Sequence, residues 1–135
     1  MDIFQDPPDY CYVYTRANAI EDGYLVDVSE TAQEAGFKVP VAITRAVWAD
    51  CVAWDDETGE RKGVPQDEAG RLWDVVYMAN LTARKRGDDS RRHFEVYRVP
   101  PDGQEIEPVV VELAMEIGPG DNHEPVITIS FPEED

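Results

Sequence analysis

The sequence is poor in the residues that carry most metal and nucleophilic chemistry. Its 135 residues include two cysteines and two histidines. Cys11 and Cys51 form no C-x-x-C pair, and neither histidine lies in an H-E-x-x-H motif, so no zinc site of the usual spacing can be drawn. The G-x-S-x-G motif and the glycine spacing of a phosphate-binding loop are absent too. We therefore expect no cofactor, no metal and no catalytic residue of a familiar type.

Long apolar runs are also missing. No run approaches the roughly 18 residues that a membrane span needs. The first ten residues, MDIFQDPPDY, contain neither the basic nor the apolar region of a signal peptide. We expect a cytoplasmic protein without membrane contact, in which both thiols are reduced and Cys51 lies in the core.

Positive charge is scarce and unevenly placed. The chain has 29 acidic residues against 12 Lys and Arg, which gives a formal net charge of −17. Residues 99–135 hold ten acids and no Lys or Arg, whereas residues 61–98 hold six acids and nine bases. Such a charge repels nucleic acid and anionic membranes and favours basic partners. The alternative interpretation is that the acidity serves only solubility.

What remains is typical of one folded domain. A chain of this length, with 42% hydrophobic residues and three tryptophans, is large enough to bury a continuous core. We expect a single domain over residues 1–135, in which residues 1–10 form a flexible acidic arm.

Helices dominate the predicted N-terminal half. Thr15 and Gly23 are suited to begin and end a first short helix, and residues 24–28 cluster Tyr, Leu and Val as in a short strand. A second short helix ends at Gly36. Thr44 is the predicted N-cap of a third helix, which reaches about residue 54.

A polar loop over residues 55–66 and a long helix are predicted next. Asp67 and Glu68 place negative charge at the start of this helix, and Gly87 stops it. Its predicted core face consists of Leu72, Val75, Val76, Ala79 and Ala83.

From residue 93 the hydrophobic period changes from 3.6 to 2. The segments HFEVYRV, PVVVELAMEIG and VITISF alternate, and the turn sequences PPDGQ and GPGDNHEP separate them. Three antiparallel strands with one apolar face need a cover, which amphipathic helices supply. The predicted fold class is α+β, with a helical N-terminal half packed on a C-terminal three-stranded antiparallel β-meander. The segment at residues 24–28 leaves room for one short extra strand.

Three segments together resemble a known family. They are YTRANAIEDGYLVDVSETAQEAGFKVPVAITRAVWADCVAW, QDEAGRLWDVVYMA and GDNHEPVITI, which span roughly residues 10–131. In this order they resemble a family of small uncharacterised proteins carried by phages, plasmids and other mobile elements. That family is a domain of unknown function, so the resemblance implies a genomic setting and transfers no catalytic residue.

Exposed carboxylates are the candidate partner-binding residues. An acid at a helix C-terminus opposes the helix dipole, so folding does not explain the pair at residues 21–22. Two acids of the second alternating segment share the outer sheet face, about 13–14 Å apart at the usual strand rise. The candidates are Glu21, Asp22, Asp55, Asp56, Glu57, Glu112 and Glu116.

Mimicry of DNA is one form that binding could take. Duplex DNA carries one charge per roughly 1.7 Å of axis, so a mimic must array its carboxylates densely. Glu105 and Glu107 are candidates to extend the row of Glu112 and Glu116. An ordinary solvated sheet face is the alternative interpretation.

Two further clusters have structural as well as functional interpretations. His123 lies between Asp121 and Glu124 and could act as a ligand or base, but the surrounding Gly, Pro, Asp and Asn are also turn residues. A basic cluster could contact phosphates, although capping of the long helix and pairing with Asp88 and Asp89 are favoured. This cluster consists of Arg84, Lys85, Arg86, Arg91 and Arg92.

These observations favour a non-enzymatic acidic interaction protein of a phage or mobile element. We expect it to inhibit a host defence system, of anti-CRISPR or anti-restriction type, by docking on a basic nucleic-acid-binding surface. The expected partner is a basic protein or nucleoprotein complex such as a defence nuclease, with no direct binding of nucleic acid. Two alternatives stay open: a small enzyme or ligand-binding protein that uses the His123 turn, and an accessory protein of plasmid replication or conjugation. The sequence leaves monomer and homodimer equally open.

Overall fold

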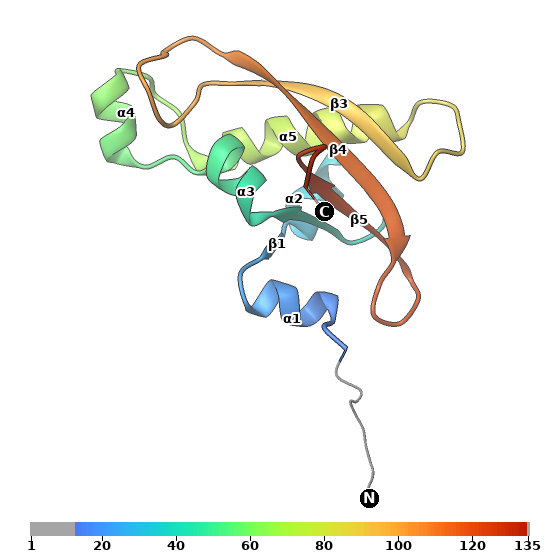
Figure 1. The fold of residues 1–135 in the computed structure, drawn as a ribbon. Coiled ribbons are helices and arrows are strands. Elements are labelled where there is room, and N and C mark those ends of the chain that lie inside the picture. Colours follow the sequence, from blue (N-terminus) through green and yellow to red (C-terminus); the bar gives the residue numbers. More distant parts are fainter. Residues whose placement is uncertain (1–12, 135) are drawn as a thin grey trace, which may run out of the picture.

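The computed structural model describes residues 13–134, and these form an α+β fold around one sheet (Figure 1). The predicted arm at residues 1–10 and Cys11 lie outside the described residues. The elements are α1 (Arg16–Glu21), β1 (Leu25–Asp27), α2 (Ser29–Ala35), β2 (Val41–Thr44), α3 (Arg45–Val47), the π-helix η1 (Trp48–Val52), α4 (Asp56–Lys62), α5 (Glu68–Ala83), β3 (Arg91–Arg98), β4 (Val109–Pro119) and β5 (Pro125–Ser130).

The sheet is mixed and has five strands in the order β1-β2-β5-β4-β3. Strands β3, β4 and β5 form the predicted antiparallel meander. Strand β2 then pairs in parallel with β5, with Val41 opposite Ile127, and β1 pairs antiparallel with β2. The short extra strand for which residues 24–28 left room is present as β1. The prediction of a three-stranded antiparallel sheet was wrong, because the sheet is mixed and has five strands. Strand β2 is an unbroken apolar run buried on both faces, as parallel strands are, and its partner is too distant in sequence for a local pattern to reveal.

The core lies between the sheet and helices α2 and α5. Helix α5 buries four of the five predicted core residues, Leu72, Val75, Val76 and Ala79. The fifth, Ala83, is exposed, because it is the last residue of the helix. Across from them the sheet contributes fully buried Ile43, Leu113 and Ile129. No helix among residues 13–134 has the length and apolar character required to cross a bilayer.

Several helix ends follow the predicted capping chemistry. Thr15 is the N-cap of α1, and its hydroxyl accepts a hydrogen bond from the backbone N–H of Asn18 at 3.0 Å. Thr44 caps α3, and the Asp67 carboxylate accepts from the N–H of Gly70 at the start of α5. Gly23 follows α1 with φ of +83°, a conformation that glycine adopts without strain.

In the middle of the chain, one prediction is confirmed in part and another was wrong. The helix expected to continue from Thr44 is α-helical only over α3 and then widens into the π-helix η1. The expected polar loop at residues 55–66 contains helix α4. Its N-cap is Asp55, which accepts from the N–H of Thr58 at 2.8 Å, and left-handed Gly63 ends it. These local caps offset the weak helix propensity of Thr58 and Gly59.

Candidate interaction surface

Two cations of α4 hold the connection between β3 and β4, residues 99–108. The Lys62 ammonium donates to the main-chain carbonyl oxygens of Pro100, Asp102 and Glu105 at 2.5, 3.0 and 2.6 Å. Lys62 is only 9% exposed. The neighbouring Arg61 guanidinium donates to two more carbonyl oxygens of the same connection, at 2.7 and 3.2 Å. Segments about 40 residues apart in sequence thereby become one unit.

This unit is strongly acidic, and we call it the acidic lobe. It lies at one end of the molecule, where α4 meets the β3–β4 connection (Figure 1). Three of the predicted residues lie at the start of the helix whose other end holds the second segment. Its exposed carboxylates belong to Asp55, Asp56, Glu57, Glu60, Asp102, Glu105 and Glu107.

The cations of the acidic lobe leave its carboxylates free of direct ion pairs among the described residues. Lys62 and Arg61 direct their donors at carbonyl oxygens instead. One carboxylate has a clear local role: hydrogen bonds from Thr58 lower the pKa of Asp55 below its ordinary value. Asp55 is therefore held ionised at the N-terminus of α4 and stabilises that helix.

The predicted acids of β4 lie on the sheet face that points away from the core, where they have cross-strand partners. Glu112 lies 3.1 Å from Nδ1 of His93, and Glu116 pairs with Arg91 at 3.4 Å. Glu95 lies directly opposite Glu112 in the strand register. Because bases alternate with acids, this face is not a dense row of carboxylates. Glu105 and Glu107 do not extend the row, since both lie in the acidic lobe before β4 begins.

The third group of predicted residues is at the end of α1, away from the acidic lobe (Figure 1). The Asp22 carboxylate accepts a hydrogen bond from the Tyr14 hydroxyl at 2.6 Å. Glu21 is exposed. The seven predicted residues therefore occupy three separate places, and only Asp55, Asp56 and Glu57 join a larger cluster.

The turn around His123 is a structural joint between β4, β5 and α1. The Asp121 carboxylate accepts from the backbone N–H groups of Arg16 and Ala17 at 2.8 and 3.1 Å, at the N-terminus of α1. Glu124 accepts from the N–H of Asn122 at 2.9 Å, and His123 adopts a left-handed φ of +68°. The turn interpretation is confirmed. Within residues 13–134, no group of three or more His, Cys, Asp or Glu side chains could hold a metal ion.

A buried cation network between η1, α5 and β3 was not found from the sequence. The Arg71 guanidinium lies 4.6 Å from the ring centroid of Trp54 and donates to the carbonyl oxygens of Val52 and Val99. Burial lowers the pKa of Arg71. Beside it, Asp50 and Arg98 form an ion pair at 2.9 Å. The only feature of the sequence that could have indicated this network was an arginine on an otherwise apolar helix face.

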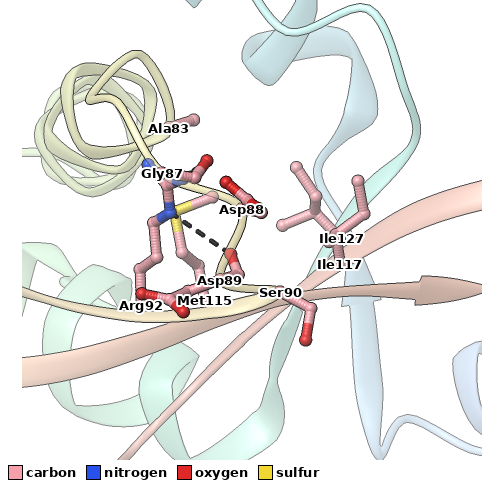
Figure 2. A pocket seen from close by; sticks show the side chains of 9 residues that line it. All are labelled: Ala83, Gly87, Asp88, Asp89, Ser90, Arg92, Met115, Ile117 and Ile127. Atoms are coloured by element: carbon pink, nitrogen blue, oxygen red, sulfur yellow. Dashed lines mark hydrogen bonds between the residues drawn. The ribbon is translucent and has the colours of Figure 1, made fainter.

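A hollow of about 260 Å³ lies between the C-terminal end of α5 and strands β4 and β5 (Figure 2). Met115, Ile117 and Ile127 provide apolar walls, and Asp88 and Asp89 line the hollow from the loop between α5 and β3.

Arg92, beside this hollow, shows what one member of the basic cluster does. Its guanidinium donates to the carbonyl oxygens of Thr82, Lys85, Gly87 and Asp89, at distances between 2.6 and 3.3 Å. Arg92 thus caps the end of α5, as the favoured interpretation required, although through main-chain oxygens rather than the two aspartates.

The matching family model covers residues 1–135 and is described as a family of unknown function, DUF6573. The chain belongs to this family. No curated protein and no solved structure matches the DUF6573 chain. Its function must therefore be argued from its own surface.

Proposed function

We propose that the chain is a non-enzymatic interaction protein that docks its acidic lobe on a basic surface of a partner protein. The observation that carries this proposal is the gathering of seven exposed carboxylates from two distant segments. The two cations that join these segments are directed at main-chain oxygens. An array of this kind attracts a positively charged surface, accelerates encounter and disfavours acidic competitors.

The rigidity of the lobe also supports docking. Lys62 holds the β3–β4 connection at three carbonyl oxygens, so the carboxylates of this connection are positioned before a partner arrives. A surface that is already ordered loses less conformational entropy on binding. The alternation of bases and acids on the sheet face favours docking through the lobe over close imitation of a DNA backbone.

The partner class that we propose is a nucleic-acid-binding protein or nucleoprotein of host defence, of the restriction or CRISPR type, met in the cytoplasm. Such proteins bind phosphates through Lys and Arg grooves, which are the surfaces that a cluster of carboxylates fits. The resemblance to proteins of phages and plasmids supports this setting. An accessory protein of plasmid replication or conjugation would use the same contact on another basic partner.

The test compares two variants with the same change in net charge. The first carries Asp56→Asn, Glu57→Gln, Glu105→Gln and Glu107→Gln in the acidic lobe, and leaves the N-cap Asp55 intact. The second carries Glu21→Gln, Glu30→Gln, Glu34→Gln and Glu95→Gln, all at exposed positions outside the lobe. A pull-down from the host with the wild-type chain identifies the partner, and binding is then measured between about 50 and 500 mM salt.

We expect the lobe variant to bind at least about tenfold more weakly, which corresponds to about 1.4 kcal/mol. The second variant should retain most of the affinity, and the wild-type affinity should fall steeply with salt. Inhibition of DNA cleavage by the captured nuclease should follow the same order. Equal loss in both variants, or binding that is insensitive to salt, would contradict docking through the lobe.

A further inference from the structure

Helix α5 is apolar on two sides. Its inner side is part of the core, but Trp73, Tyr77 and Leu81 follow one another at four-residue spacing on the side that faces solvent. They are 38%, 46% and 40% exposed, and we call them the α5 stripe. The rings of Trp73 and Tyr77 stack with their centroids 6.0 Å apart. The outward face of a surface helix is normally polar, so an aromatic stripe there indicates an interaction site.

The two ends of the α5 stripe carry opposite charges. At the N-terminal end, Asp67 and Asp74 line a hollow of about 610 Å³ beside Trp73 and Gly70. Burial raises the pKa of Asp74, and the nearby Arg71 lowers it in part. At the C-terminal end, Arg84 and Lys85 follow the helix and are exposed.

This arrangement is self-complementary. We propose that α5 forms the centre of a symmetric homodimer, in which the α5 stripes of two copies pack antiparallel about a two-fold axis at Tyr77. In such a pair, the residue n positions after Tyr77 in one copy lies level with the residue n positions before Tyr77 in the other copy. Leu81 then meets Trp73 of the second copy, and the two Tyr77 rings meet at the axis.

The same axis brings the opposite charges together. Lys85 lies eight residues after Tyr77, and Asp67 and Asp74 lie ten and three residues before it. Lys85 of the second copy therefore reaches the hollow between these two carboxylates. The Arg84 guanidinium takes no part in this contact, because it lies over Gly36 within its own copy.

Charge complementarity is what selects a second copy as the occupant. A basic peptide would satisfy Asp67 and Asp74 but would leave Lys85 facing solvent or like charge. An acidic peptide would have the opposite defect. A second copy pairs both ends at once and covers the aromatic rings between them, as isologous interfaces do. The dimer does not depend on the proposed function, because the acidic lobe contributes none of these residues.

The test is the oligomeric state of the full chain, measured by sedimentation velocity from about 1 μM to 1 mM. We expect a reversible dimer. Asp74→Arg and Lys85→Glu should each raise the dissociation constant at least about tenfold, because each brings like charges together in the hollow that Lys85 of the second copy enters. Asp74 is preferred to Asp67 for this substitution because Asp67 also caps α5. Circular dichroism checks that both variants remain folded.

The decisive sample is an equimolar mixture of the two variants. In a mixed dimer, Arg at position 74 of one copy shares a hollow with Glu at position 85 of the other, and the remaining hollow holds the natural Asp74 and Lys85. Dimers should therefore return in the mixture. Glu57→Lys, which alters charge in the acidic lobe, should leave the dissociation constant unchanged.

Three results would overturn the homodimer: a wild-type chain that stays monomeric at 1 mM, a dimer that both single variants leave intact, or a mixture that fails to recover. A monomer that binds oligolysine in a manner dependent on Asp74 would also overturn it and would identify a basic peptide as the occupant.

Discussion

At the scale of single residues, main-chain carbonyl oxygens accept hydrogen bonds from several cationic side chains. Lys62 contacts three carbonyl oxygens of the β3–β4 connection, and Arg92 contacts four near the end of α5. Carbonyl oxygens satisfy the donors without using a carboxylate. The acidic side chains of the lobe consequently stay on the surface without direct ion pairs among the described residues.

Removing the Lys62 ammonium should destabilise the protein and loosen the acidic lobe. Lys62→Met keeps most of the aliphatic stem but leaves three carbonyl oxygens without their donor. We expect the free energy of unfolding in urea to fall by about 2–4 kcal/mol. Exposed Glu60 on the same helix provides the control, since Glu60→Gln should change it by less than about 0.5 kcal/mol. Equal effects of the two substitutions would show that the carbonyl contacts contribute nothing.

Cys51 should make the protein sensitive to alkali. Burial and the nearby Asp50 raise the pKa of its thiol from 9.0 to about 12 in the folded state. Between these values the unfolded chain loses the proton and the folded chain keeps it, so stability is complete below pH 9 and falls as the pH rises. The loss is at most about 1.4 kcal/mol per pH unit.

The measurement for Cys51 is urea unfolding at pH 8, 9 and 10. Cys51→Val removes the titrating group at similar volume and should flatten the decline relative to the wild type. Cys11→Ser in both proteins removes the second thiol from the comparison. Parallel declines with and without Cys51 would refute its role.

At the scale of elements, the β3–β4 hairpin carries an electrostatic conflict. Glu95 and Glu112 are directly opposite one another on the exposed face. Like charges in that position are destabilising. His93 and Arg91, on the same strand as Glu95, provide the opposite charge to Glu112 and Glu116.

Replacing Glu95 should relieve this conflict. Glu95→Lys places an ammonium opposite Glu112 and should raise the free energy of unfolding by about 0.5 kcal/mol at low ionic strength, with a smaller gain at high salt. Glu107→Lys makes the same charge change in the connection, outside the strand pairing, and should raise stability less. If both substitutions stabilise equally, the gain reflects net charge and not the cross-strand pair.

Elements with local signals were predictable from the sequence. Thr15, Thr44 and Asp67 mark helix starts because each side chain accepts a hydrogen bond within three residues. The alternation in β3, β4 and β5 likewise reports a sheet with one buried face. The π-helix η1 was missed because the widening of a helix turn leaves no residue pattern of its own.

Features that join distant segments were not predictable. The acidic lobe depends on Lys62 reaching a connection about 40 residues away. Neither segment contains a sequence pattern that predicts its contact with the other. For the candidate site, Asp55, Asp56 and Glu57 are exposed, as expected of solvated acids. That their helix is joined to the segment of Glu105 and Glu107 could be learned only from the fold. The α5 stripe was overlooked because Trp73 and Tyr77 lie beside apolar core residues in a single long helix.

At the scale of the whole molecule, the net charge of −17 means that the acidic side chains repel one another and destabilise the folded state. The acidic lobe holds seven exposed carboxylates, so repulsion within the lobe should be the largest local contribution. Screening by salt reduces such repulsion, since the Debye length falls to about 10 Å at 0.1 M.

Salt should therefore stabilise the wild-type chain. We expect the melting temperature to rise between about 20 and 300 mM NaCl, and to rise less in the variant whose four acidic-lobe residues are neutralised. The variant with four neutralised acids outside the lobe should respond more like the wild type. The same salt response in both variants would mean that the repulsion is spread over the whole surface.

The parallel pairing of β2 with β5 has a consequence for synthesis. Strand β2 ends at Thr44 and its partner begins at Pro125, so a ribosome that adds about 5–20 residues per second needs about 4–16 seconds to supply that partner. During this interval β1 and β2 have emerged without the strand that completes their side of the sheet. The nascent chain thus offers an open strand edge to chaperones for seconds, and the sheet closes only once its central strand arrives.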